Sequence, residues 1–531
     1  MRAPLSTAEN RNFPPHAVCT LGSPFDAKGR MRNVNALRTL VCALLALTAV
    51  VAVPGVANAG SRQLSLIQDD AEMFSERPGE TPDAAMQELR ELGVDVLRTN
   101  VLFYRVYQGI NDKQRPAGFD ATNPNDSRYD WAPTDRIVDL ARKNGIKLLF
   151  TVSGPGPHWA SETPSKCKRN SICPWRPNAT VFGQFAAAVA KRYKGKVDWY
   201  SIYNEPNIEG WIKPQFTRTS AGRVETAGIY YRKLWLAGYK SIAKYDPARR
   251  GRVLFGEVAA ISEPLPKMYA ALCLDPTGKP FKGRLKKLNQ CGKVTRLNIG
   301  GWAIHPYNQG GLGSPWRTTT SKTALPQQYI PRLHKLMARA AGRGRVPGGK
   351  GIYITEFGYQ TNPPDPISST SPSEQAAYIN ISDRLFFGDP RIKTVAQYQL
   401  VDVRDKAQYN SGLRFAGTKD RKPSYDAYRI PLVVTKRSSR TVEVYGQVRP
   451  ARVARLANTF SAPELQFARP GGGFQTISRP RLNSVGIFRI NQSRAGATKG
   501  RWRIKWQNSL IGSVSYSRVA KAGKVLKYFR N

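Results

Sequence analysis

The sequence is short of acidic residues: 37 Asp and Glu stand against 82 Lys and Arg in 531 residues, which gives a net charge of +45. Such a charge attracts anionic polymers, including acidic glycans, wall polymers and nucleic acid, but it says nothing of the fold. The hydrophobic fraction of 41% and the charged fraction of 22% exclude a chain that is disordered throughout. At this length we expect one large domain and a smaller one.

Histidine and cysteine are also scarce. The four histidines are scattered, so they indicate no metal site. The four cysteines beyond residue 60 include no CxxC pair, which argues against a zinc site built from all four. Four cysteines allow three pairings, and proximity favours two short disulfide loops, which an exported protein would retain. We expect neither a metal nor a cofactor, and the favoured pairs are Cys167–Cys173 and Cys273–Cys291.

The sequence has no apolar run long enough for a membrane span. The run Leu40–Val53 falls short of the roughly 20 residues that a span requires. Two arginines precede it and Ala-Asn-Ala follows at 57–59, a pattern typical of a secretory signal peptide over residues 31–59. An uncleaved signal anchor is the alternative. We therefore expect residues 1–59 to be removed and the mature protein to be secreted, extracellular or associated with a cell wall. Without this segment, which holds six Lys/Arg and two Asp/Glu, the net charge is +41.

Between residues 60 and 431, short β-rich runs alternate with helical patterns, as in parallel α/β folds. No GxGxxG follows the first run, so nothing indicates a dinucleotide site, and an open doubly wound sheet is the weaker alternative. Eight such units predict a (β/α)8 TIM barrel. The predicted strands are Leu64–Gln68, Val94–Thr99, Ile146–Val152, Val197–Tyr203, Val253–Glu257, Asn298–Ile304, Gly351–Thr355 and Val395–Leu400.

The pattern changes at about residue 432, and residues 432–531 predict a small all-β sandwich without a convincing helix. Residues 435–531 hold twenty Lys/Arg and two Asp/Glu. This domain either binds an anionic cell-surface polymer or packs on the barrel with a solvated basic surface. Trp502 and Trp506 share one face of a strand and should point into the core, so we expect no nucleic-acid partner. The predicted strands are Leu432–Thr435, Thr441–Val448, Val453–Asn458, Leu465–Ala468, Phe474–Ile477, Val485–Ile490, Arg501–Trp506 and Val514–Val519.

Two glutamates follow predicted barrel strands. The fourth strand runs into Asn204-Glu205-Pro206, and the seventh into Thr355-Glu356-Phe357. The carboxyl ends of barrel strands converge on one face, so these two side chains should meet across its mouth. A pair of carboxyls about 5–5.5 Å apart hydrolyses glycosidic bonds with retention of configuration. A structural ion-pair role is the alternative. Glu257, at the end of the fifth strand, is a third acid in this layer, and we interpret it as a substrate contact or a structural carboxylate.

These motifs resemble those of the clan-A glycoside hydrolases, which include family 5 cellulases and family 39 xylosidases, over roughly residues 64–430. The resemblance implies a retaining β-glycosidase that acts on a poly- or oligosaccharide, with Glu205 as general acid/base and Glu356 as nucleophile. It also implies that Arg98 keeps the nucleophile ionised. The eighth strand lacks the tryptophan usual in the clan, and Tyr398 or Gln399 is the candidate replacement. The substrate-binding residues implied are Asn204, Arg98, His305, Tyr307, His158, Trp159 and Tyr398.

Two other functions fit the same sequence. A non-catalytic, cationic protein that binds glycan or wall polymer could use the barrel as a scaffold. A cationic adhesin could bind anionic polymer through the C-terminal domain, with binding that salt abolishes and no turnover. We expect a monomer in each case.

Overall fold

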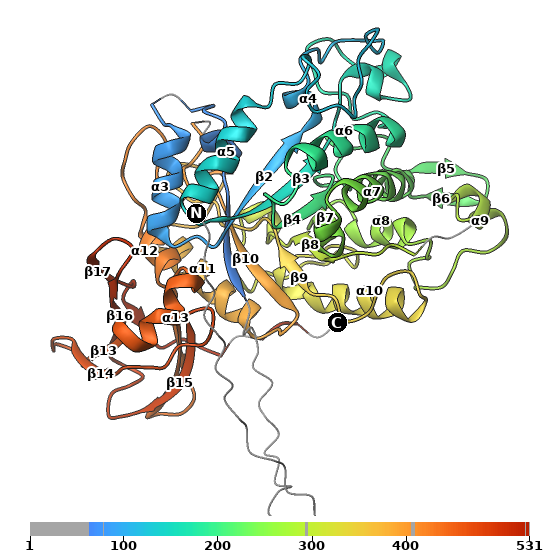
Figure 1. Ribbon diagram of the computed structural model, residues 1–531. Coiled ribbons are helices and arrows are strands. Elements are labelled where there is room, and N and C mark those ends of the chain that lie inside the picture. The colour runs from blue at the N-terminus through green and yellow to red at the C-terminus, as the bar shows by residue number, and fades with distance from the viewer. Residues whose placement is uncertain (1–62, 78, 293–295, 405–408, 526, 530–531) are drawn as a thin grey trace, which may run out of the picture. The chain divides into compact units, whose positions relative to one another are not determined.

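The computed structural model describes residues 63–77, 79–292, 296–404, 409–525 and 527–529 (Figure 1). The predicted N-terminal segment 1–59 lies outside these residues. Eight strands, each parallel to its neighbours, form a closed barrel in the order β1-β10-β9-β8-β7-β4-β3-β2, which confirms the predicted (β/α)8 fold. The barrel strands are β1 (Leu64–Gln68), β2 (Val96–Leu102), β3 (Lys147–Ser153), β4 (Trp199–Ile202), β7 (Val253–Ala259), β8 (Gly301–His305), β9 (Ile352–Ile354) and β10 (Ile392–Tyr398).

The helices begin where the sequence supplies caps. The Thr81 side chain accepts a hydrogen bond from the amide of Ala84 at 3.2 Å, and Pro82 occupies the first turn of α3. Ser371 and Glu374 form a capping box at the start of α11. The helices of the barrel region are α2 (Asp70–Met73), α3 (Pro82–Leu92), α4 (Phe103–Val106), α5 (Ala132–Lys143), α6 (Ala179–Arg192), α7 (Thr226–Tyr245), α8 (Pro264–Ala271), α9 (Gly283–Leu288), α10 (Ile330–Gly342), α11 (Pro372–Phe387) and α12 (Pro423–Arg429); a hairpin of β5 (Thr217–Thr219) and β6 (Gly222–Val224) precedes α7.

The C-terminal residues form two antiparallel sheets, β11-β12-β15 and β14-β13-β16-β17, with β18 also paired to β16. Trp502 and Trp506 are buried in their shared core, and the predicted sandwich is confirmed. The predicted strand Val453–Asn458 is wrong, because this segment belongs to helix α13. Val453, Ala454 and Ala457 are buried, a spacing that fits a helix and not an alternating strand. The elements are β11 (Leu432–Lys436), β12 (Thr441–Gln447), α13 (Ala451–Phe460), β13 (Glu464–Ala468), β14 (Gln475–Ser478), β15 (Ile487–Ser493), β16 (Arg501–Asn508), β17 (Ser513–Tyr516) and β18 (Ala520–Lys521).

This sandwich is bonded to the barrel at the end opposite the mouth. The amide of Ala451 donates to Asp95 Oδ1 at 2.8 Å, and Asp95 immediately precedes β2. Buried Arg449 donates to the Tyr428 carbonyl at 2.6 Å and pairs with Asp383 at 3.2 Å.

Two disulfides, Cys167–Cys173 and Cys273–Cys291, are present and match the favoured pairing. Both close loops in the barrel region, outside the eight strands. Within the described ranges, no helix has the length and apolar character needed to cross a bilayer.

Candidate active site

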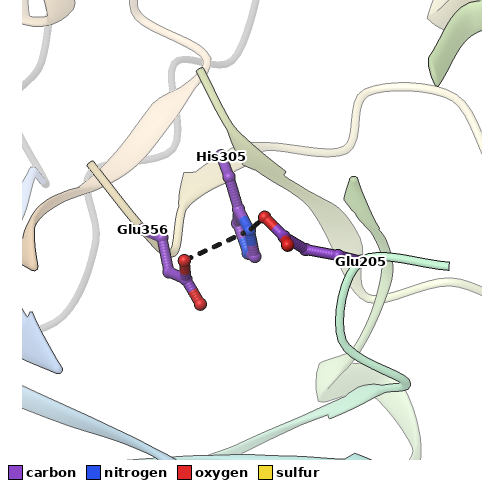
Figure 2. Close-up of side chains that lie close together, drawn as sticks. All are labelled: Glu205, His305 and Glu356. Carbon is purple, nitrogen blue, oxygen red and sulfur yellow. Dashed lines mark hydrogen bonds and ion pairs between the residues drawn. The ribbon is translucent and has the colours of Figure 1, made fainter. Parts of the chain in front are cut away.

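Glu205 and Glu356 extend from the carboxyl ends of β4 and β9. Figure 2 shows both side chains pointing toward His305, which stands at the end of β8. The backbone around Glu205 is strained: φ is +37° at Glu205 and +64° at Tyr203. Left-handed conformations at such residues cost about 1–3 kcal/mol each and persist where the surrounding structure holds them. Here the Glu205 amide donates to the Glu257 carbonyl at 2.8 Å, which fixes the turn that aims Glu205 into the mouth.

Arg98, on β2, is fully buried beneath the glutamates. One of its amino groups, Nη1, donates to Glu356 Oε1 at 2.6 Å and also to the Gln68 side chain. The other, Nη2, donates to Glu257 Oε2 at 2.6 Å and to Asn204 Oδ1 at 2.7 Å. The guanidinium therefore ties two carboxylates together and orients the Asn204 amide through its oxygen.

Glu257 reaches the site because β7 contains a bulge. The pairing of β7 with β8 shifts register between Gly256 and Val258, and Glu257 itself has φ +47°. Gly256 has φ +126°, and a Cβ there would lie 2.3 Å from the Ala303 carbonyl oxygen, so only glycine fits. A bulge re-aims the side chain it carries, and here Glu257 turns into the barrel and is fully buried.

His305 bridges the carboxylates. Its Nε2 lies 2.8 Å from Glu257 Oε2, and its Nδ1 lies 2.9 Å from Glu205 Oε1 and 3.5 Å from Glu356 Oε2. Both ring nitrogens thus face carboxylate oxygens, an arrangement that favours the doubly protonated, cationic ring.

Burial and charge oppose each other in this cluster. Burial by itself would raise the pKa of Glu257, but Arg98 and His305 lower that pKa to about 2. Burial disfavours the charged ring of His305, yet Glu356, Glu205 and Glu257 raise its pKa to about 9. Burial raises the pKa of Glu356; His305 and Arg98 oppose this rise but do not cancel it. At neutral pH Glu257 is therefore an anion and His305 a cation. Arg98 acts on the pKa of Glu356 in the predicted direction, and its role in keeping Glu356 ionised stays a prediction.

Three tyrosines line the site beside Glu356. The Tyr307 hydroxyl donates to Glu356 Oε2 at 3.4 Å. The Tyr307 ring is 6.5 Å from that of Tyr398 and 6.2 Å from that of Tyr409, and the last two rings are 6.2 Å apart. Tyr398 lies at the end of the strand that lacks tryptophan, as the sequence suggested. Tyr409 was missed because it follows β10 in a loop without a motif; its side chain is 46% exposed.

His158 and Trp159, two of the implied substrate contacts, are buried in a 3₁₀ turn after β3. The His158 Nε2 lies 3.1 Å from the Ser171 carbonyl oxygen. The Trp159 ring packs edge-on against Phe103 and Tyr107. With 2% and 8% of their surfaces exposed, both side chains pack within the loop, and their contact with substrate stays a prediction.

Two residues at the end of β1 were not anticipated. Gln68 accepts a hydrogen bond from Arg98. Asp70 accepts from the Asn100 amide at 3.1 Å and from its side chain at 2.8 Å, and burial raises the pKa of Asp70. Their position at the carboxyl end of a barrel strand was the only available signal.

Among the described residues, one cluster could hold a metal ion: Glu205, His305 and Glu356, which offer ligand atoms within 4.8 Å of one another. Arg98 already donates to Glu356 Oε1, and Glu257 occupies the far nitrogen of His305. A metal ion would therefore have to compete with Arg98 for Glu356 and displace the proton of the cationic His305 ring. The geometry fits an ion-paired site better than a metal centre.

Comparisons with known proteins found likeness in structure alone. No protein-family model and no curated protein matches the sequence. A family 39 glycoside hydrolase from Bacteroides cellulosilyticus aligns over 82% of this chain and 80% of its own, at 16% identity and a TM-score of 0.45. A glucosidase from Croceicoccus marinus aligns over 82% of both chains, at 11% identity and 0.46. The catalytic core of a xylanase A covers 69% of this chain and 96% of its own, at 14% and 0.40. Because the sequence identities and TM-scores are this low, the roles of individual residues rest on the geometry of the site itself.

Proposed function

We propose that this chain is a secreted retaining glycoside hydrolase that cleaves β-linked glycosidic bonds in an extracellular or cell-wall glycan. Glu205 acts as general acid/base and Glu356 as nucleophile. The observation that carries the proposal is the spacing of their carboxylates, whose nearest oxygens lie within 4.8 Å. Retaining enzymes hold the two carboxyls about 5–5.5 Å apart, whereas inverting enzymes separate them by about 6.5–9.5 Å to admit a water.

A charge count supports the assignment of roles. Arg98 and His305 supply two positive charges to the cluster, and Glu257 supplies one negative charge. Uncompensated buried charge is costly, so the remaining positive charge favours an ionised nucleophile. The 2.6 Å hydrogen bond from Arg98 favours the charge on Glu356. Glu205, whose side chain is 21% exposed against 10% for Glu356, lies on the solvent side, where it can reach the departing oxygen.

The reaction then follows from these positions. A Glu356 oxygen attacks the anomeric carbon while Glu205 protonates the departing glycosidic oxygen, and a glycosyl ester forms on Glu356. Glu205, now a carboxylate, takes a proton from a water whose oxygen attacks the same carbon, and this step releases Glu356. Asn204, held through its oxygen by Arg98, presents its amide N–H groups to the sugar. Tyr307 supports Glu356 through its hydroxyl.

The test is hydrolysis of a panel of aryl β-glycosides and β-linked polysaccharides by the mature protein, Glu205→Ala, Glu356→Ala and the control Glu209→Ala. Glu209 is an exposed carboxylate four residues from Glu205. The wild type and the control should be active. Azide should rescue Glu356→Ala and yield a glycosyl azide of inverted configuration, and should rescue Glu205→Ala with retained configuration. Activity that survives in both alanine variants at the site would refute the assignment.

Secretion is supported by the signal-like segment and the two disulfides. We further propose that the basic sandwich anchors the enzyme to anionic cell-surface polymer, since it carries twenty Lys/Arg against two Asp/Glu. Expression of the full chain in a secreting host should give a mature N-terminus at Gly60. The protein should sediment with an insoluble anionic polysaccharide at low salt and be released by about 0.5 M NaCl. Retention at high salt would contradict electrostatic anchoring.

A further inference from the structure

Two adjoining hollows lead away from the candidate active site. The first, of about 540 Å³, lies between the loops that follow β7 and β8, and Tyr307 forms part of its wall. Tyr307 also contacts Glu356, so this wall of the hollow adjoins the candidate active site. The second, of about 670 Å³, lies between α8 and α10 and shares Thr319 with the first. The two neighbouring hollows are here called the cationic trough, and the volume of each is in the size range of ligand sites.

The trough carries charge of one sign. Its lining includes five cations and no Asp or Glu. The acids nearest in sequence have partners elsewhere: Glu263 pairs with Arg223, and Asp275 accepts from Thr277 and Lys279. The five cations are Arg317, Lys322, Arg332, Lys335 and Arg339.

These cations combine fixed and exposed groups. Arg332 is fixed, because it donates to the carbonyls of Ser321 and Ala324 at 2.6 and 3.0 Å and lies over the Tyr329 ring. Arg339 donates to the Tyr269 hydroxyl at 3.1 Å. The other three are exposed. Arg332, Lys335 and Arg339 follow one another at spacings of three and four residues on α10, so they share one face of the helix.

Like charges gathered in a depression repel one another, and an anionic ligand relieves that repulsion. We propose that the trough binds anionic substituents of the glycan, such as the carboxylates of uronic acid residues or sulfate esters, several sugars away from the cleaved bond. The substrate is then an acidic β-linked polysaccharide. A neutral glycan would favour exposed aromatic faces, but Tyr329 is covered by Arg332 and by Phe529. This inference rests on the proposed function, because it places the trough beside the cleavage site.

The test measures binding, so that it does not require turnover. The inactive Glu356→Ala protein is titrated at 0.15 M NaCl with three probes: cellohexaose, its C6-carboxylated form and its C6-sulfated form. The trough variant adds R317Q, K322Q and K335Q, all at exposed positions. The matched control adds R142Q, K143Q and K194Q, three exposed cations at or just beyond the ends of helices α5 and α6, which lower the net charge equally.

At least one anionic hexasaccharide should bind ten times more tightly than cellohexaose, a difference of about 1.4 kcal/mol. The trough variant should lose that advantage, and the control should stay within twofold. A preference for the carboxylated or the sulfated probe identifies the anion. Equal binding of all three probes, or an equal loss in the trough variant and the control, overturns the proposal. If the anionic probes bind tightly but the wild type hydrolyses no substrate, the trough proposal holds and the assignment as a hydrolase is rejected. If the wild type hydrolyses neutral glycan and the trough substitutions change the binding of none of the probes, the hydrolase assignment holds and the trough proposal is rejected.

Discussion

Replacing Glu257 with glutamine tests the ion-pair network more directly than any change at the two proposed catalytic residues. Glutamine matches glutamate in shape but carries no charge. Glu257 contacts Arg98 at 2.6 Å and His305 at 2.8 Å, so the substitution leaves two buried cations short of one anion. Breaking a buried ion pair in this way costs about 3–5 kcal/mol of stability.

The pH at which this loss appears follows from the direction of each pKa change. The pKa of His305 is raised from 6.5 to about 9, which at ~1.4 kcal/mol per pKa unit corresponds to ~3 kcal/mol. A histidine whose pKa is raised on folding stabilises the folded protein. This contribution to the free energy of unfolding is complete below pH 6.5 and is lost as pH rises through 9. The pKa of Glu257 is lowered to about 2, so its contribution is present above pH 4.5 and is lost as pH falls toward 2. Without Glu257 the pKa of His305 falls, and the alkaline loss moves toward neutral pH.

The assay combines kcat/KM for a hydrolysed aryl β-glycoside with urea unfolding between pH 4 and 10. For Glu257→Gln we expect an alkaline limb at least one pH unit lower and a fall in kcat/KM of about 10²-fold at the optimum. Asp95→Asn is the control, because Asp95 is also buried but accepts hydrogen bonds from Ser65 and Ala451 at the other end of the barrel. It should lose stability without shifting the activity profile. A Glu257→Gln profile that superimposes on the wild-type profile would refute the reasoning.

Three further substitutions or treatments have defined outcomes. Gly256→Ala should lower the free energy of unfolding by about 2–4 kcal/mol in urea titrations, since its Cβ would lie 2.3 Å from the Ala303 carbonyl oxygen; an unchanged midpoint would show that the bulge relaxes. Tyr409→Ala should raise KM about tenfold with kcat within twofold, because the exposed ring borders the sugar site without touching the carboxylates; a fall in kcat alone would contradict this. Dialysis against EDTA should leave kcat unchanged, and a loss restored by a divalent ion would show that Glu205, His305 and Glu356 bind metal.

The barrel could be predicted because its signal is repeated eight times. Each strand is a short apolar run followed by a helical pattern, and an error of two residues at one boundary does not alter the count. The segment Val453–Asn458 shows the opposite case. It is a single short run beside many strands, and its helical spacing becomes evident only where Val453, Ala454 and Ala457 are buried together in α13.

The residues of the candidate site also fall into two groups: those whose position the sequence predicts and those whose position depends on contacts between elements. Glu205 and Glu356 lie just beyond the carboxyl ends of β4 and β9, where position in the sequence predicts position in space. Arg98 lies within β2, in a run that the sequence predicts as a strand. The central place of Glu257 depends on the register shift between β7 and β8, which is a property of two strands and cannot be read from either one. The contact of Trp159 with a sugar stays a prediction: a loop motif does not specify which face of a ring is covered, and here Phe103 and Tyr107 pack against the ring.

The overall charge of the protein makes one more prediction about this site. The catalytic cluster is close to neutral, but it lies in a chain that carries a net charge of +45 as written. A positive field stabilises anions and repels protons, so at low salt it lowers every pKa that governs activity. Salt screens charges beyond a Debye length of about 8 Å at 0.15 M, whereas the contacts inside the cluster, at 2.6–2.9 Å, are too short to be screened. Both limbs of the kcat/KM profile should therefore move to higher pH, by a few tenths of a unit, between 10 mM and 0.5 M NaCl, while their separation stays constant. Limbs that move apart or toward lower pH would mean that salt acts on the cluster itself, and that the surface charge has no part in setting the working pH.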